Sequence, residues 1–582
     1  MEFKNIKEDE RLNILNHSAA HVMAQAIKNL YPNAKFWVGP VIEEGFYYDV
    51  DIEENSIKEE DFEKIEKEMK KISKSAKYII RKEISKKEAL DIFKGDRYKI
   101  DLINKFQEDE IISCYSQGDF IDLCRGPHVE TTREVKHFKL LKASGAYYKG
   151  DVNEKMLQRV YGIAFYSQED LDKHLYLIEE AKKRDHKKLG KKLSLFLTHQ
   201  HAPGSVFFLH KGNILKKQLE DFWYKEHLKE GYIFINTPTM LDKELWQTSG
   251  HWENYKDNMY ITKIEEKEFA IKPMNCPGGI IVYKDSIHSY KEFPLRIGEL
   301  GHVHRYEASG ALNGLLRLRS FTQDDAHIYM RENQIEQEVS NLIAFIDRVY
   351  KIFGLSYDIE LSTRPLEKYI GTKEIWDKSQ EALKRACKRA KKDFKINEGD
   401  GAFYGPKLDF HIKDSLGRSW QCATIQLDMN LPERFDLNYI EEDGSKVRPI
   451  MVHRVIYGAI ERFIGILIEH FAGAFPLWLA PTQIIINPVN SQVHLDYAKE
   501  VKEKLLKEGF RVELDDRNEK LGYRMREARE QKIPYQIVLG DNEKESKTIN
   551  LKIFGNDKDN KVITLDEFIK KAKKTIENYE LN

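Results

Sequence analysis

The stretch HRYEASGALNGLLRLRSFTQDDAH, residues 304–327, decides the fold of the largest part of this chain. It joins two runs of strand character, near 295–304 and 320–330, through a loop that contains glycine and arginine. Arg305 stands at the end of the first strand and Glu307 begins the loop. A guanidinium can bind a phosphate through two hydrogen bonds, and a carboxylate can accept one from an adenine amino group. The stretch therefore predicts an antiparallel pair of strands that binds a nucleotide.

Glycine-rich phosphate loops are missing from the sequence. No GxxxxGK[ST] segment occurs, and no GxGxxG follows a predicted strand. A nucleotide must then be held by side chains on a sheet, where Arg317 and Arg462 supply further fixed positive charge. A single Arg–Glu pair is more often an ordinary charge pair on a surface hairpin. The complete string, together with GAIERF at 458–463, favours the nucleotide site.

Three side chains that can bind a metal lie in segments of the same character. Cys276 lies in IKPMNCPGG (271–279), His327 ends the arginine-containing stretch, and His453 lies in VHRVIYGAIERF (452–463). One thiolate and two imidazoles form a good ligand set for zinc, with a coordination position left open for a substrate. If the fold brings them together, a metal lies beside a phosphate site.

Composition limits the class of protein. The 582 residues suffice for three or four domains, and a net charge of −1 means that any nucleic-acid surface is a local patch. Five irregularly spaced cysteines argue against a disulfide framework and favour a reducing cytosol. Neither an apolar leader nor an apolar run of membrane-spanning length occurs. We expect a soluble cytoplasmic protein that does not contact a membrane.

Hydrophobic patterning divides the chain into four segments and gives a multidomain α+β fold class. Residues 1–165 mix helices and strands, and 166–190 form a connecting helix. Residues 191–480 place strands next to strands, which suits an antiparallel sheet backed by helices. Residues 481–582 alternate strands and helices around solid apolar runs, typical of a small α/β domain with a mainly parallel sheet.

The individual elements follow from the same periodicities. The predicted helices are 13–30, 58–75, 212–230, 453–471, 493–506 and 520–532. The predicted strands are 36–41, 45–51, 97–103, 119–124, one ending at Pro238, 295–304, 320–330, 403–412, 418–427, 482–489, 510–516, 534–540 and 548–554.

A second group of potential ligands lies near the N-terminus. His17 and His21 are four residues apart, so they share one face of the predicted helix. Asp122, Cys124 and His128 lie in DLCRGPH, where the Gly-Pro pair favours a loop. An HxxxH pair with a CxxxH pair has the spacing of a metal site. These residues alone leave open whether the pocket holds a metal.

Taken together, these strings resemble the class II aminoacyl-tRNA synthetases, and within that class the threonyl-tRNA synthetases. The class features are the strand ending at Pro238, the Arg305–Glu307 loop and GAIERF on a helix. KPMNCPGG, FTQDDAH, GAFYGPKLDF, SWQCATIQLD and RNEKLGYRMRE resemble strings of the threonine family, over essentially the whole chain. The resemblance implies a homodimeric ligase, assembled through 212–238, that joins L-threonine to tRNA(Thr) using ATP with Mg²⁺. Many family members begin with a small ubiquitin-like domain, which we expect this chain to lack.

The resemblance assigns roles to matching positions. Cys276, His327 and His453 match the ligands of one zinc ion per subunit, completed by the amino and hydroxyl groups of threonine. The ATP-binding positions are Arg305, Glu307, Arg317, Gln421, Gln426 and Arg462. The threonine-binding positions are Gln323, Asp325 and Tyr404. The catalytic positions are Arg305, Arg462, Lys407 and His251, the last acting on the terminal ribose of the tRNA.

Selectivity explains why the family needs a second site. Valine lacks the hydroxyl that would bind the metal, whereas serine lacks only a methyl group, worth about 1–3 kcal/mol of discrimination. Residues 1–165 resemble the family's editing domain, which hydrolyses seryl-tRNA in a metal-free pocket. The matching editing positions are His17, His21, Lys99, Asp122, Cys124 and His128.

The C-terminal segment resembles the family's anticodon-binding domain, over 481–582. The anticodon-binding positions are Asn518, Lys532, Glu543 and Lys552, where the two lysines replace expected arginines. The basic residues of 520–532 suit either a solvated helix face or contacts with phosphates.

Three other interpretations stay open for the sequence. A serine or proline ligase would share the arginines but not the Cys276–His327–His453 set. A free-standing editing enzyme would need only residues 1–165. A non-enzymatic RNA-binding regulator would tolerate the loss of Arg305, Arg462 or a zinc ligand, and none of these is lost.

Overall fold

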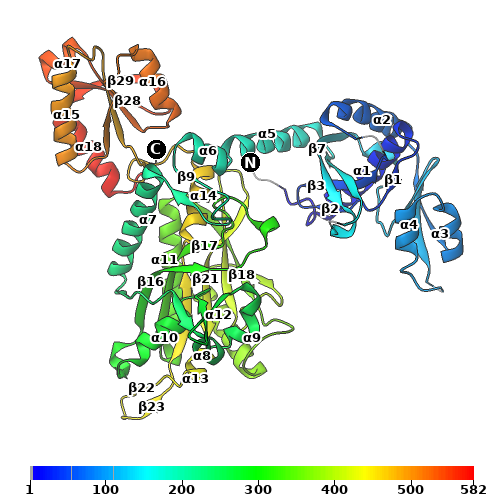
Figure 1. Ribbon diagram of the computed structural model, residues 1–582, viewed down its shortest axis with the longest axis horizontal. Helices are drawn as coiled ribbons and strands as arrows, with labels where there is room; N and C mark the ends of the chain where they lie inside the picture. The colour runs from blue at the N-terminus through cyan, green and yellow to red at the C-terminus, as the bar shows by residue number, and fades with distance from the viewer. Residues whose placement is uncertain (1–3, 54–55, 109, 152, 582) are drawn as a thin grey trace. The chain divides into compact units, whose positions relative to one another are not determined.

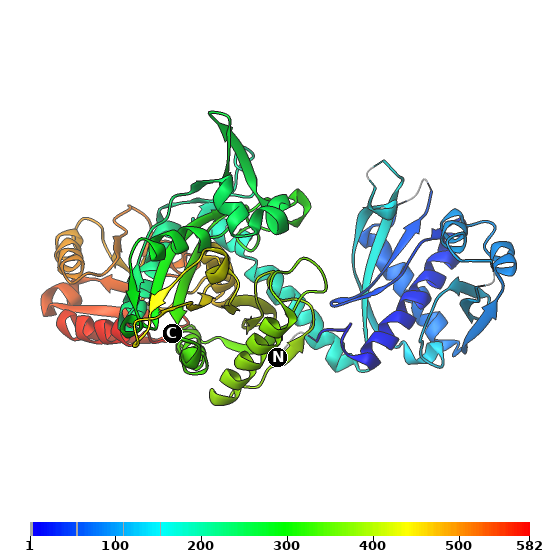
Figure 2. The same cartoon turned by 90° about the horizontal axis from the view of Figure 1, so that it is seen from below.

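The computed structural model describes residues 4–53, 56–108, 110–151 and 153–581. It separates into two compact units, Met1–Glu180 and Ala181–Asn582, which Figures 1 and 2 show and which are described separately below. Helices and sheets occur in both units, so the predicted α+β class is confirmed. None of the described helices is long and apolar enough to cross a membrane.

The first unit is built around a long helix that packs on a sheet. Helix α1 (Glu10–Leu30) is capped by Asp9, whose carboxylate accepts a backbone N–H of the first turn. It packs against β3 (Gly45–Asp51) and β8 (Met156–Phe165), and β8 pairs with β7 (His137–Tyr147). Figure 1 shows α1 in dark blue beside these strands. The apolar face of α1 and the inner face of the sheet form the core of this unit.

A smaller sheet completes the first unit, and a helix of the same unit differs from the sequence prediction. It consists of β4 (Ile79–Ile84), β5 (Ile112–Gln117) and β6 (Phe120–Leu123). The strand predicted at 97–103 is instead helix α4 (Arg97–Ile103). Asp96 caps it by accepting two backbone N–H groups, and this local signal outweighs the alternation of apolar residues.

The second unit contains a large sheet whose central strands are antiparallel, as predicted. In spatial order its strands are β11 (Ile233–Phe234), β16 (Leu295–His304), β17 (Ser320–Met330), β24 (Ile450–Val455), β21 (Ser419–Asp428), β20 (Lys407–Lys413), β18 (Ser356–Ser362) and β19 (Lys395–Asn397). Only the outermost pair at each end is parallel. The strand expected to end at Pro238 pairs over Ile233–Phe234 alone.

Helices cover one face of this sheet and leave the other face to polar side chains. The covering helices include α7 (His210–Lys229), α11 (Ile335–Ile352), α12 (Lys373–Arg389) and α14 (Ile460–His470). On β17, Ala326 and Ile328 belong to the apolar core under the helices. Because strand side chains alternate, Gln323, Asp325 and His327 project to the opposite face. This alternation positions the candidate site.

The helix predicted at 453–471 is shorter than expected. Its first residues belong to β24, so His453 lies on a strand, and α14 begins only at Ile460. The β-branched residues Val452 and Val455 favour the strand. Gly458 has a φ of 77° in the turn that follows, a left-handed conformation that suits glycine.

The predicted connecting helix is divided in two. Helix α5 (Gln168–Arg184) is followed by α6 (His186–Lys192), and Asp185 between them is non-helical with a ψ of 119°. Its carboxylate accepts two backbone N–H groups of α6 and so caps the new helix.

The C-terminal part of the second unit is a five-stranded sheet with helices on both faces (Figure 1). In spatial order the strands are β26 (Val512–Leu514), β25 (Ile484–Pro488), β27 (Tyr535–Leu539), β28 (Thr548–Ile553) and β29 (Asn556–Thr564). Ile484 and Ile486 pack with α15 (Leu495–Lys507) and α18 (Leu565–Glu577), and Ile485 packs with α16 (Leu521–Glu530). The prediction of a mainly parallel sheet is partly correct. Strands β26, β25 and β27 pair in parallel, whereas β28 and β29 are antiparallel.

Candidate functional sites

A cavity of about 850 Å³ opens on the polar face of the large sheet. Segments far apart in the sequence, from β17, β20, β21, β24 and α14, contribute its walls. The predicted site residues that line it are Cys276, Arg305, Glu307, Arg317, Gln323, Asp325, Tyr404, Lys407, Gln421, Gln426, His453 and Arg462. The structure thus brings the predicted nucleotide and amino-acid positions into one space.

Three potential metal ligands converge at the inner end of this cavity. Cys276 begins α10 (Cys276–Lys284), and His327 on β17 lies directly opposite His453 on β24. Their candidate ligand atoms all lie within 4.8 Å of one another, and all three side chains are buried. His327 Nε2 has no hydrogen-bond partner among the described residues.

The chemistry of these donors fits a zinc ion. A buried polar atom without a partner is costly, and a bound metal ion would remove that cost at His327. Burial lowers the pKa of His327 to about 4, so its imidazole is neutral and can bind a metal. Burial raises the pKa of the Cys276 thiol, and the charge of a bound cation opposes that shift. Two imidazoles and one thiolate leave a fourth tetrahedral position for a substrate.

A small polar pocket surrounds the three ligands. The Asp325 carboxylate lies 3.9 Å from His327 Nε2 and accepts a hydrogen bond of 3.1 Å from the Asn275 amide. The Tyr404 hydroxyl donates to Gln426, and Gln323 Oε1 is buried without a partner among the described residues. The pocket can therefore accept hydrogen bonds from an amino group and a hydroxyl. The sequence analysis did not identify Asn275, although it lies inside the quoted KPMNCPGG string.

Arginines provide the positive charge in the outer part of the cavity. Arg305 Nε donates to the Pro273 carbonyl at 3.1 Å, which fixes the guanidinium and leaves its terminal nitrogens available. Arg317 pairs with the Glu307 carboxylate at 3.1 Å. Arg462 lies in the first turn of α14, and its Nε is buried without a partner among the described residues. This arrangement suits a polyphosphate.

A buried carboxylate organises two further residues of the cavity wall. Asp409 on β20 forms an ion pair of 2.9 Å with Lys407 and accepts 2.6 Å and 3.1 Å hydrogen bonds from Gln421 and Thr424. The predicted positions Lys407 and Gln421 are therefore held in place by one acidic side chain.

His251 does not line the cavity. Its ring is fully buried at the start of α9 (His251–Tyr255), with Nδ1 2.8 Å from Ser249 Oγ and Nε2 3.8 Å from Cys276 Sγ. Burial lowers its pKa to about 3. Of the predicted catalytic residues, His251 alone lies behind the metal ligands instead of on the wall.

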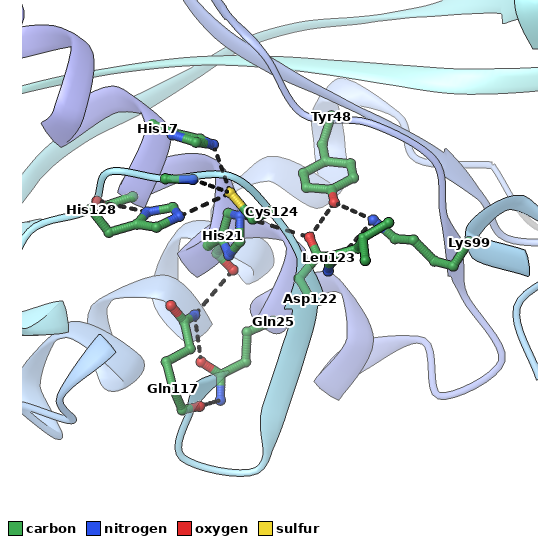
Figure 3. A network of polar contacts seen from close by, with 12 residues as sticks. His17, His21, Gln25, Tyr48, Lys99, Gln117, Asp122, Leu123, Cys124 and His128 are labelled. Carbon is green, nitrogen blue, oxygen red and sulfur yellow. Dashed lines mark hydrogen bonds and ion pairs between the residues drawn. The ribbon is translucent and has the colours of Figure 1, made fainter. Parts of the chain in front are cut away.

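A second constellation lies in the first unit and is drawn in Figure 3. His17 Nε2 and His128 Nε2 each lie 3.2 Å from Cys124 Sγ, and the His21 ring lies 4.3 Å from the His128 ring. Burial lowers the pKa of all three histidines and raises the pKa of Cys124 to about 11. The pocket is therefore made of neutral imidazoles and a neutral thiol.

An ion pair closes one side of this second pocket (Figure 3). Lys99 Nζ lies 2.5 Å from the Asp122 carboxylate, and both side chains are buried. The Tyr48 hydroxyl donates to Asp122 and accepts from Lys99 at 3.1 Å. The structure brings all predicted residues of this site together and adds Tyr48. Tyr48 lies in the predicted strand 45–51, and nothing in that stretch of sequence signals that its hydroxyl meets Asp122.

The predicted anticodon positions lie apart from the cavity of their domain. Asn518 is exposed, Glu543 accepts the Gly540 N–H at 2.9 Å, and Lys532 lies 5.2 Å from the Phe554 ring. Lys552 is half-buried on β28. None of the four lines the cavity of about 380 Å³ beside α16.

Three segments of the chain match models of known families. Residues 112–161 match "Threonyl and Alanyl tRNA synthetase second additional domain". Residues 260–471 match "tRNA synthetase class II core domain (G, H, P, S and T)". Residues 483–575 match "Anticodon binding domain".

Curated relatives and solved structures point the same way. The chain is 53% identical over 577 residues to the threonine–tRNA ligase of Clostridioides difficile, covering 99% of this chain and 90% of that protein. It is 54% identical over 573 residues to that of Fusobacterium nucleatum, covering 98% and 92%. A crystal structure of the RNA-binding domain of threonyl-tRNA synthetase from Cryptosporidium parvum aligns with a TM-score of 0.65 and 40% identity, over 67% of this chain and 98% of that chain.

Proposed function

This chain belongs to the threonine–tRNA ligase family, and from that premise we propose how its residues carry out the two reactions. It activates threonine with ATP to threonyl-adenylate, with release of pyrophosphate, and transfers threonine to the 3′ end of tRNA(Thr). Its N-terminal domain hydrolyses seryl-tRNA(Thr). The main support for this function is the convergence of Cys276, His327 and His453 at an arginine-lined cavity.

The proposed amino-acid site contains one zinc ion per subunit held by those three side chains. When bound there, zinc supplies a coordination position for the amino and hydroxyl groups of threonine. Asp325 accepts a hydrogen bond from the hydroxyl, and Gln323 and Tyr404 line the same pocket. Valine is rejected because it has no hydroxyl to bind the metal or to donate a further hydrogen bond to this buried carboxylate.

The proposed ATP site uses the arginines of the same cavity. Arg305 binds the α-phosphate, and Glu307 accepts from the adenine amino group. Arg317 and Arg462 contact the triphosphate, which Mg²⁺ accompanies, or the adenine. The remaining residues, Lys407, Gln421 and Gln426, surround the adenylate. Catalysis comes mainly from alignment and electrostatic stabilisation, since the threonine carboxylate is already a competent nucleophile.

Replacing Arg462 tests this assignment. We expect Arg462→Lys to lower kcat/KM for ATP by about 10²-fold, because an ammonium cannot reproduce the two-pronged contact of a guanidinium. The measurement is threonine-dependent exchange of pyrophosphate into ATP. Arg385→Lys, at an exposed position on α12, is the matched control and should leave exchange unchanged. Equal rates of pyrophosphate exchange in the two variants would show that Arg462 does not bind ATP.

The proposed editing pocket is metal-free and consists of His17, His21, Lys99, Asp122, Cys124 and His128, with Tyr48 added. Neutral imidazoles and the thiol of Cys124 hold the seryl ester and a water molecule by hydrogen bonds. The buried Lys99–Asp122 pair, which Tyr48 supports, fixes the wall beside them.

The proposed domain boundaries follow the same division. Residues 1–165 form the editing domain, 166–190 the connection, 191–480 the catalytic domain and 481–582 the anticodon-binding domain. Within the last, Asn518, Lys532, Glu543 and Lys552 contact anticodon bases. The five free cysteines suit a cytoplasmic location.

A homodimer is proposed through α7 and β11. Apolar side chains are exposed there, with Leu228 63% and Ile233 52% accessible, and β11 is an edge strand that can pair with a second chain. We expect the double substitution Leu228→Asp and Ile233→Lys to weaken the dimer by at least about 10²-fold. Light scattering across a concentration series measures the change.

The control for this experiment lies on the other edge of the same sheet. Ile396 on β19 is 56% exposed, so Ile396→Lys makes a comparable surface change away from the proposed interface. A wild-type protein that is monomeric at all concentrations, or a double variant that dimerises normally, would contradict the proposed interface.

A further inference from the structure

Asp428 lies at the end of β21 with one carboxylate oxygen against a proposed zinc ligand. Its Oδ2 is 2.9 Å from His453 Nε2, and the side chain is fully buried. Asp428 ends the quoted string SWQCATIQLD, but the sequence assigned it no role, and it does not line the cavity.

The other carboxylate oxygen is fixed by the backbone. Asp428 Oδ1 accepts the N–H groups of Asn430 at 2.7 Å and Leu431 at 3.0 Å, at the start of α13 (Leu431–Arg434). The Asn430 side chain then donates to the Tyr404 carbonyl at 2.6 Å. The carboxylate is therefore held from one side by a turn that also contacts the threonine pocket.

This geometry determines which nitrogen of His453 carries the proton. A carboxylate accepts hydrogen bonds and cannot donate them, so the hydrogen lies on Nε2. In the uncharged form that metal binding requires, the ring then has its lone pair on Nδ1, which is the nitrogen free to bind a metal. Histidines that bind metals commonly donate their second ring N–H to a carboxylate in this way.

We propose that Asp428 is a positioning residue that holds His453 in the Nε2–H tautomer and in the orientation needed to bind zinc. The inference rests on the zinc site of the proposed function. It adds that the affinity for the metal depends on a residue that touches neither metal nor substrate.

The substitution Asp428→Asn separates charge and tautomer from shape. An asparagine has one acceptor and one donor, and two backbone N–H groups face the Oδ1 position. Its carbonyl must face them, since a buried N–H without a partner is costly. Its NH₂ group then faces His453 Nε2, which must accept, so the proton moves to Nδ1, where the metal should bind.

Zinc affinity is the measurement, made by competition with a chromogenic chelator on the full-length protein. We expect Asp428→Asn to weaken zinc binding about 10–100-fold, the usual effect of losing such a partner. Asp414→Asn is the matched control, because Asp414 is a buried aspartate that also accepts two backbone N–H groups in a turn, yet contacts no proposed ligand. It should retain wild-type zinc affinity.

The possible outcomes separate the two proposals. If the wild type binds zinc and Asp428→Asn binds it equally well, the role of Asp428 is wrong and the zinc site stands. If the wild type binds no zinc, the zinc site itself is wrong. Should Asp428→Asn fail to fold, the ¹⁵N spectrum of the wild-type histidines decides the matter. A protonated Nε2 on His453, assigned by its loss in His453→Asn, is expected, and a protonated Nδ1 would overturn the inference.

Discussion

Cys276→Ser is expected to lower threonine-dependent pyrophosphate exchange by about 10³-fold, equivalent to about 4 kcal/mol. A serine hydroxyl stays protonated near neutral pH and is a poor zinc ligand, so the variant should purify without stoichiometric zinc. Without the metal, the pocket loses the group that binds the amino and hydroxyl groups of threonine, while the arginines of the ATP site stay in place. Exchange and zinc content are measured on the same preparation.

A second cysteine provides the control for this experiment. Cys387 on α12 is fully buried in the core of the same unit and contacts no site residue that the sequence predicts. Cys387→Ser therefore introduces the same chemical change with the same burial, and it should retain both zinc and exchange. Undiminished exchange in Cys276→Ser would refute the metal's role in binding threonine, and a loss in both variants would reveal a general effect on folding.

Cys124→Ala is expected to slow hydrolysis of seryl-tRNA(Thr) by about 10²-fold or more, within the range of general acid–base catalysis. Cys124 Sγ lies within 3.3 Å of His17, His128 and the backbone N–H of Gly126, so its loss disconnects the pocket. Charging with threonine should not change, because the activating residues lie in the other unit. The variant should therefore accumulate seryl-tRNA(Thr) when serine is supplied.

The matched control is Cys114→Ala on β5 of the same unit. Cys114 is fully buried and packs in an apolar cluster with Phe93 and Ile103. Its replacement removes the same atom without touching the histidines. Equal rates of seryl-tRNA hydrolysis in Cys124→Ala and the wild type would exclude Cys124 from editing.

Much of the catalytic site could be predicted because its signals are local. The strands β16 and β17 begin and end at the predicted residues, since the alternation of polar and apolar residues continues up to the arginine-containing loop. Side chains from segments up to 177 residues apart, Cys276 to His453, meet in one place because each segment carries its own recognisable chemistry. The fold then brings these segments together.

The incorrect secondary-structure predictions have local causes that compete with the periodicity of apolar residues. Residues 97–103 form helix α4 instead of the predicted strand because Asp96 caps it. This helix places Lys99 against Asp122. The left-handed Gly458 lies in the turn between β24 and α14, and His453 therefore lies on a strand opposite His327 and not on the helix. In both cases one residue of the turn outweighed the apolar pattern around it.

Supporting residues were beyond the reach of sequence patterns. Asp428, Tyr48 and Asn275 act through contacts with side chains 25 to 74 residues away in the chain. An aspartate at the end of a strand or a tyrosine within one is common in any sheet. Only the three-dimensional arrangement shows which buried hydrogen bond each one makes. His251 shows the reverse, because the resemblance assigns it a catalytic role but the side chain is buried and does not line the cavity.

The most direct test of the account is an anomalous diffraction map at the zinc absorption edge, from crystals of the full-length protein grown with threonine. The account predicts one strong peak per subunit, in contact with Cys276 Sγ, a ring nitrogen of His327 and Nδ1 of His453, and with the amino and hydroxyl groups of the bound threonine. A map with threonine in the cavity but no peak between those three side chains would contradict it.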